Sequence, residues 1–234
     1  CAVLTAAKFS RLRELAVLLD PQSATPAAVQ ALLSSVPLVE TVSLLLREAQ
    51  DKSGDTKAAT KSVKPRACLP KPLVRLSRLE SLHLPIADDA LLTAFDMPAL
   101  KSLQLSGAGV VVRELQRCLA LTPSLQQLTL HFLPDVRMAS DRSRPLKHLR
   151  SLGITYSNLA HDGFCALLQQ SPNLHSLAVT QSGQLGLPSL RFLLSLRLPK
   201  LASLDFGPTE PVDADTIAAF VRSFPLLEHM LANV

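Results

Sequence analysis

The sequence predicts an α/β solenoid, in which short parallel strands line the concave side of a curved stack and helices cover its convex side. Three observations predict this fold class: an apolar phrase that recurs along the chain, a proline at a fixed position before it, and helix-like stretches between its copies. Apolar residues make up 47% of the 234 residues and charged residues 18%. This composition supplies a sizeable core and excludes a mainly disordered chain.

The recurring phrase is an apolar residue followed three and five positions later by two more, as in Leu100, Leu103 and Leu105. Because side chains alternate along a strand, the second and third of these residues point to one face, which we expect to be the core. Successive copies begin 21 to 27 residues apart, except for one interval of 40. The nine copies begin at Leu12, Val39, Leu79, Leu100, Leu125, Leu149, Leu174, Leu201 and Leu227.

A proline stands two positions before the phrase in six of the nine copies. Proline cannot continue a helix and biases the preceding residue towards extended structure, so we expect it to end each helix before the next strand. These prolines are Pro37, Pro98, Pro123, Pro172, Pro199 and Pro225.

The stretches between the copies carry apolar residues at helical spacing. Thr25 before Pro26 is typical of a helix N-cap followed by proline in the first turn, and Asp213 and Asp215 favour another N-terminus. Strands and helices with one apolar side cannot bury it alone, so the copies must stack. We expect helices over residues 27–34, 88–95, 110–120, 162–170, 187–195 and 213–223.

The segments SPNLHSLAVTQS and YSNLAHDGFCALLQQSPNL carry the phrase, the proline and the helix pattern in one reading frame. In carrying these three features together, the chain resembles leucine-rich repeat proteins. The resemblance is to the ribonuclease-inhibitor subclass and to the cysteine-containing subclass that is associated with F-boxes. The resemblance implies a horseshoe of about nine repeats, a single domain over residues 1–234. Those proteins often carry Asn or Cys eight positions after the first leucine, where this chain has other residues, among them Ser157 and Ser182. Its turns must therefore satisfy their backbone groups in another way.

Two irregular stretches hold an excess of positive charge. Residues 49–72 form an insertion without helical spacing, which we expect to be a flexible basic loop. The charges balance to +6 over residues 51–78 and +3 over residues 135–150, against +5 for the whole chain. The stretches either keep apolar loops soluble or contact an acidic partner. The candidate contacts are Lys61, Lys64, Arg66, Arg137, Arg142 and Arg144.

The residues between the core positions of each strand are expected on the concave face. They are mostly small and polar, without a continuous charge stripe, and form either a solvated face or a shallow groove for a peptide or helix. Phe132 and Tyr156 share one offset, two positions past the third apolar residue, and strand alternation predicts that they point into the core. The candidate concave contacts are His83, Gln104, Thr129, His131 and Arg150.

The chain carries none of the common phosphate-loop, dinucleotide, zinc-protease or nucleophile-elbow motifs, so we expect neither an enzyme nor a bound cofactor or metal. Its four cysteines are far apart and lack CxxC spacing, which argues against a disulfide framework or zinc module and favours a reducing compartment. Cys118 and Cys165 are interpreted as buried structural thiols, and His161 and Asp162 as residues that open a helix.

The function predicted is a non-catalytic protein-interaction module or scaffold, a fragment of a longer eukaryotic intracellular protein of the cytoplasm or nucleus. It docks a protein partner on the concave face or basic loops, with no membrane segment and no small-molecule substrate. One alternative, from the resemblance alone, is an F-box-type substrate receptor of a ubiquitin ligase. Another is an RNA-associated assembly protein that uses the basic loops, which a lack of interleaved aromatics makes the weaker hypothesis.

Overall fold

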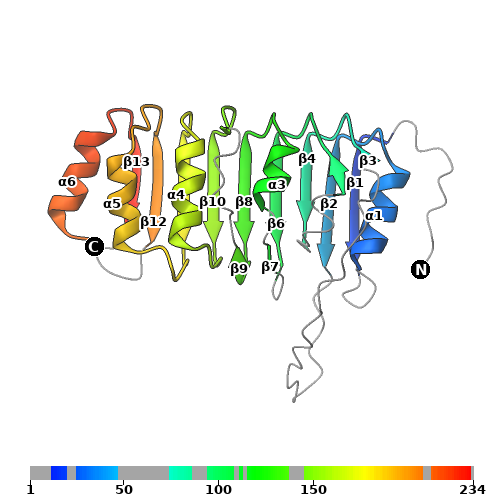
Figure 1. The fold of residues 1–234 in the computed structure, drawn as a ribbon, viewed down its shortest axis with the longest axis horizontal. Coiled ribbons are helices and arrows are strands. Elements are labelled where there is room, and N and C mark those ends of the chain that lie inside the picture. The colour runs from blue at the N-terminus through cyan, green and yellow to red at the C-terminus, as the bar shows by residue number, and fades with distance from the viewer. Residues whose placement is uncertain are drawn as a thin grey trace, which may run out of the picture.

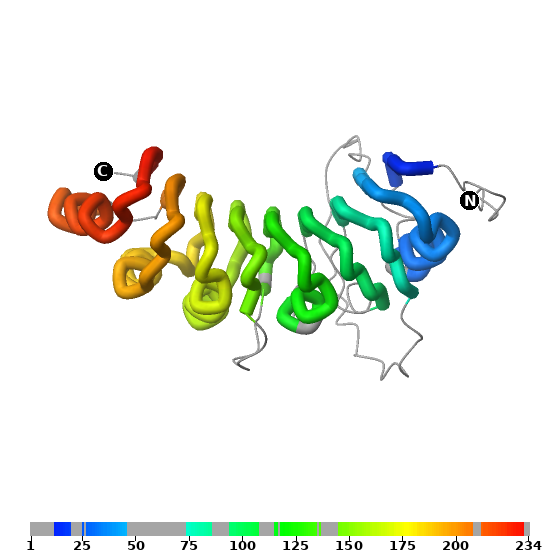
Figure 2. Tube along the Cα trace, turned by 90° about the horizontal axis from the view of Figure 1, so that it is seen from above, coloured from blue at the N-terminus to red at the C-terminus, as the bar shows by residue number. Residues whose placement is uncertain are grey.

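The structure is a computed structural model that describes residues 12–19, 25–46, 74–85, 94–107, 111–112, 115–136, 145–207 and 212–232. Nine strands form one parallel sheet, with helices packed against one of its faces (Figure 1). The sheet follows the inner side of a shallow arc and the helices the outer side (Figure 2). The prediction of an α/β fold with parallel strands on the concave side is therefore confirmed.

Each strand of the large sheet carries the second and third apolar residues of one copy of the phrase. The register places Leu82, Leu103, Leu128, Leu152 and Leu177 side by side, all buried. The strands are β1 (Glu14–Leu19), β2 (Thr41–Leu46), β4 (Ser81–Leu84), β6 (Ser102–Ser106), β8 (Gln127–His131), β10 (Ser151–Thr155), β11 (Ser176–Thr180), β12 (Ser203–Gly207) and β13 (His229–Ala232).

Five helices lie within the described residues, and their caps explain where two of them begin. Thr25 accepts a hydrogen bond from the N–H of Ala28 at 3.2 Å, and Asp213 accepts one from Thr216 at 2.7 Å, as expected of N-cap side chains. Four of the expected helices are thus present nearly as predicted. The helices are α1 (Pro26–Ser35), α3 (Leu115–Ala120), α4 (His161–Gln170), α5 (Leu187–Ser195) and α6 (Ala214–Ser223).

Two of the expected helices are wrong in part. Residues 110–120 contain a short strand, β7 (Val111–Val112), before α3, since β-branched valines favour extended backbone. Phe95, expected to end a helix, lies in β5 (Phe95–Asp96), whose backbone pairs with β3 (Val74–Arg75). β7 pairs with β9 (Asp135–Val136). Residues 88–93 of that expected helix lie outside the described residues.

The prolines occupy a turn that joins each preceding segment to its strand. In eight copies the N–H of the first apolar residue bonds the carbonyl three positions earlier, as from Leu125 to Thr122 at 3.2 Å. Proline at the following position is the second residue of this turn, where its fixed φ is favoured. The residue that opens the turn is buried in all eight, Thr122 and Ser171 included. The repeating pattern therefore includes a further buried residue, three positions before the first apolar residue of the phrase.

Candidate functional site

The concave face is built as the strand alternation predicts. Its central row runs across the whole sheet in register, so each residue lies beside the equivalent residue of the neighbouring strand. The row consists of Ala16, Ser43, His83, Gln104, Thr129, Gly153, Ala178, Asp205 and Leu231.

The middle of this face, from β4 to β11, is polar but uncharged. The described strand positions that face the concave side there include neither Asp, Glu, Lys nor Arg, and most are half-buried. The side chains of Gln104 and Thr129 form no hydrogen bond within the described part of the chain. These groups are therefore available to a bound segment. The positions of this uncharged surface are Ser81, His83, Ser102, Gln104, Ser106, Gln127, Thr129, His131, Ser151, Gly153, Thr155, Ser176, Ala178 and Thr180.

Four of the five predicted concave residues lie together on this uncharged surface, and Arg150 does not. His83 Nε2 lies 3.3 Å from the hydroxyl of Ser106, and burial, with a smaller effect of the nearby His131, lowers the pKa of His83. Arg150 precedes β10 and aligns with Gln126, whereas His131 aligns with Thr155 at the far end of the same strand. At about 3.3 Å per residue, the two rows are roughly 16 Å apart along the strand.

Phe132 and Tyr156 are exposed, so the prediction that they pack in the core is wrong. Their side chains are 47% and 48% exposed, and their rings stack with centroids 4.7 Å apart and planes inclined by 18°. The ring of His131 lies 4.1 Å from that of Phe132 and meets Tyr156 edge-on at 6.1 Å. We call the surface formed by His131, Phe132 and Tyr156 the aromatic ledge. It borders the uncharged surface at the carboxyl ends of β8 and β10.

The backbone explains why alternation fails at these two positions. Phe132 and Tyr156 have φ of 53° and 50°, in the left-handed region, so the chain leaves strand geometry and turns the side chain outward. Gln181, at the same offset after β11, has φ of 52°, which makes this conformation a property of the turn. In the sequence, the polar Gln181 at the offset that Phe132 and Tyr156 share signals exposure there.

Buried serines hold this turn at two of the positions eight residues after the first apolar residue of the phrase. Ser157 accepts a hydrogen bond from the N–H of Leu133 at 3.2 Å and donates one to the carbonyl of Thr155 at 3.0 Å. Ser182 donates longer bonds to two carbonyls, at 3.4 and 3.5 Å. The turns were expected to satisfy their backbone groups without Asn, and in these two copies serine hydroxyls bond the turn backbone.

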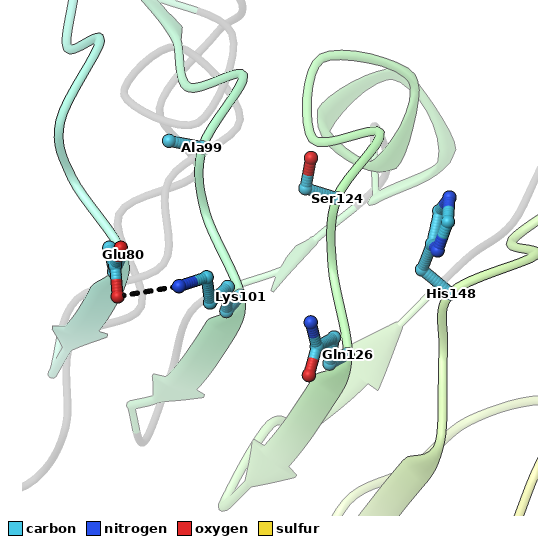
Figure 3. Close-up of a pocket in the computed structure, with 6 residues that line it drawn as sticks. All are labelled: Glu80, Ala99, Lys101, Ser124, Gln126 and His148. Carbon is cyan, nitrogen blue, oxygen red and sulfur yellow. Dashed lines mark ion pairs between the residues drawn. The ribbon is translucent and has the colours of Figure 1, made fainter.

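The opposite edge of the concave face, before the strands begin, is charged but largely paired within itself. Arg13 lies 3.9 Å from Glu40, and Lys101 lies 2.8 Å from Glu80, each pair being well exposed. Such exposed pairs stabilise a fold weakly. A hollow of about 260 Å³ opens beside the Lys101–Glu80 pair, lined also by Ala99, Ser124, Gln126 and His148 (Figure 3).

A second cluster lies on the convex side, between α4 and α5. His161 Nδ1 is 2.8 Å from the hydroxyl of Ser189, which is buried, and His161 Nε2 is 3.4 Å from the sulfur of Cys165. Cys165 is only partly buried, so its interpretation as a buried thiol is wrong, whereas Cys118 is fully buried as expected. Burial, and then the charge of Asp162, raise the pKa of the Cys165 thiol. The contact of His161 with Ser189 joins α4 to α5.

The described residues contain no group of three or more His, Cys, Asp or Glu side chains placed to hold a metal ion. Within the same ranges, no helix combines the length and apolar character that crossing a membrane requires. The basic-loop candidates Lys61, Lys64, Arg66, Arg137, Arg142 and Arg144 lie outside the described residues, as does the insertion over 49–72. A scan against models of known protein families finds no match for this chain, and no curated protein matches it.

Proposed function

We propose that this chain is a non-catalytic protein-recognition module of the leucine-rich repeat type, with about nine repeats, which binds a protein segment on its concave face. The parallel sheet, the period of the apolar phrase and the placement of helices on the convex side support the repeat type. The free thiols of Cys118 and Cys165 suit a reducing intracellular compartment, the cytoplasm or nucleus.

The observation that carries the proposal is the aromatic ledge beside the uncharged surface. Other phenylalanines of the described chain are in the core, among them Phe95, Phe164, Phe206, Phe220 and Phe224. An aromatic side chain buries 150–250 Å² when fully covered, so the exposed halves of Phe132 and Tyr156 leave roughly 150–250 Å² to a partner. At about 25 cal/mol per Å², covering them contributes about 4–6 kcal/mol before the cost of association. Aromatic side chains are enriched at protein interfaces and often anchor a partner there.

Single-stranded RNA is the second candidate, because bases also stack on exposed aromatic rings. The phosphates of a bound strand require nearby cations, and the described strand positions of the concave face from β4 to β11 carry none. Lys101 and Arg150 lie at the opposite edge, and Lys101 is paired with Glu80. A protein segment is therefore the better supported partner.

A capture experiment with the immobilised chain tests the proposal. We compare the unmodified chain with Gln104→Arg, Thr129→Arg and Phe132→Asn, and with Val221→Ala as a matched control at a residue of α6 that is 62% exposed. Asparagine at 132 tolerates the left-handed backbone, so this variant removes the ring without opposing the turn. Circular dichroism melts establish that each variant is folded.

We expect the unmodified chain and the Val221→Ala control to capture the same set of proteins from a cell extract of the source organism, and the three concave variants to lose that capture. Charge reversal of Lys61, Lys64 and Arg66 forms a separate arm for the basic insertion. Capture that is the same for all variants, or that is lost only in the charge-reversal arm, would remove the concave face from the proposal.

A further inference from the structure

The uncharged surface presents hydrogen-bonding side chains, to which an α-helical ligand offers few free backbone groups. A helix satisfies its backbone groups internally, whereas an extended or polyproline II segment has free carbonyls along its length. The amide of Gln104 and the hydroxyl of Thr129 make no bond within the described residues, and the imidazole of His83 lies beside Ser106. Donors of this kind bind the free carbonyls of an extended segment.

The charge of the surface restricts the ligand further. A bound Lys or Arg calls for a carboxylate, and a bound carboxylate or phosphate calls for Lys or Arg. The described concave positions of β4 to β11 supply neither; at the opposite edge Lys101 is paired with Glu80, and Arg150 lies roughly 16 Å along the strand from the row of His131. The part of the ligand that lies on this surface is therefore uncharged.

The aromatic ledge adds a flat apolar seat at the rim of the same surface. Phe132 and Tyr156 stack on each other and present their exposed ring edges and faces to solvent. Proline packs on aromatic rings and fixes its chain in the polyproline II conformation before binding, which lowers the entropic cost of ordering it. We infer that the ledge binds a proline of an uncharged, extended polyproline II segment of the partner, an inference that rests on the proposed function.

The spacing of the sheet predicts the spacing of the prolines. A polyproline II segment advances about 9.3 Å in one turn of three residues, and two strand intervals measure about 9.6 Å. If a segment lies across the strands with one proline on the ledge, the third residue after that proline therefore lies two strands further along the sheet. Towards β4, the strand two away from β8 is β4, which carries His83, and the strand two away from β10 is β6, which carries Ser106. Prolines three residues apart should bind better than prolines four apart.

Tyr156 provides a direct probe, because it is the only tyrosine and the chain has no tryptophan. Its emission is followed while the chain is titrated with uncharged peptides of about twelve residues, ~37 Å when extended. The probes are repeats of Pro-Ser-Ser, repeats of Pro-Ser-Ser-Ser, repeats of Ala-Ser-Ser and a single-stranded oligouridine. Labelled peptides give the affinity independently by fluorescence anisotropy, including for Phe132→Asn and the control Val221→Ala.

We expect the Pro-Ser-Ser peptide to change the emission of Tyr156 and to bind more tightly than either other peptide. Phe132→Asn should weaken its affinity about tenfold and Val221→Ala should leave it unchanged. Equal affinity for the proline and alanine peptides, or no binding at millimolar concentration, overturns the inference. Preferential binding of oligouridine that Phe132→Asn abolishes overturns it in favour of nucleic acid. In the first two cases the proposed function stands if the capture experiment still separates the concave variants from the control.

Discussion

Replacement of Ser157 by alanine tests how the turn beneath the aromatic ledge is held. The side chain is 2% exposed, and its hydroxyl accepts the hydrogen bond of the Leu133 N–H at 3.2 Å. Alanine leaves this buried N–H without a partner, which costs about 1–3 kcal/mol. We expect the free energy of unfolding, measured by urea denaturation with circular dichroism, to fall by about 2 kcal/mol.

The matched control is Ser182→Ala, one copy further along. Ser182 is also buried, at 3% exposure, but its hydroxyl only donates, to carbonyls of Thr180 and Ile154 at 3.4 and 3.5 Å. The carbonyl of Thr180 keeps a bond from the N–H of Tyr156 at 3.1 Å, so no backbone donor is orphaned there. We expect a loss below about 1 kcal/mol. If Ser157→Ala cost no more than Ser182→Ala, satisfaction of the Leu133 N–H would not be what holds the turn.

Two further predictions concern titratable groups. Burial, and then His131, lower the pKa of His83 below 6.5, so the unfolded chain binds a proton more readily than the folded one. The stability due to neutral His83 is present above about pH 6.5 and is lost as the pH falls below it. The free energy of unfolding of His83→Gln should therefore fall less between about pH 7.5 and 5.5 than that of the unmodified chain. Equal decreases in denaturation experiments would contradict this. Iodoacetamide should modify Cys165 before Cys118, whose burial raises its pKa to about 12; mass spectrometry showing similar rates would disprove it.

The strand positions of this protein were readable from the sequence because the core pattern is local and periodic. Leu82, Leu103, Leu128, Leu152 and Leu177 had to meet, since each strand buries alternate side chains and a parallel neighbour lies about 4.8 Å away. The caps at Thr25 and Asp213 were readable for the same reason, because a cap involves residues only three apart. The four candidate residues on the uncharged surface follow from the same alternation.

The aromatic ledge depended on the tertiary structure. Whether Phe132 and Tyr156 point inward or outward is decided by the sign of φ at the end of each strand, which the buried Ser157 and the neighbouring turns impose. The contact of His161 with Ser189 likewise needs α4 to pack on α5 across 28 residues of sequence. Local patterns determine which residues form strands and helices, but the direction of a side chain at a turn is determined by packing between copies, which no single copy contains.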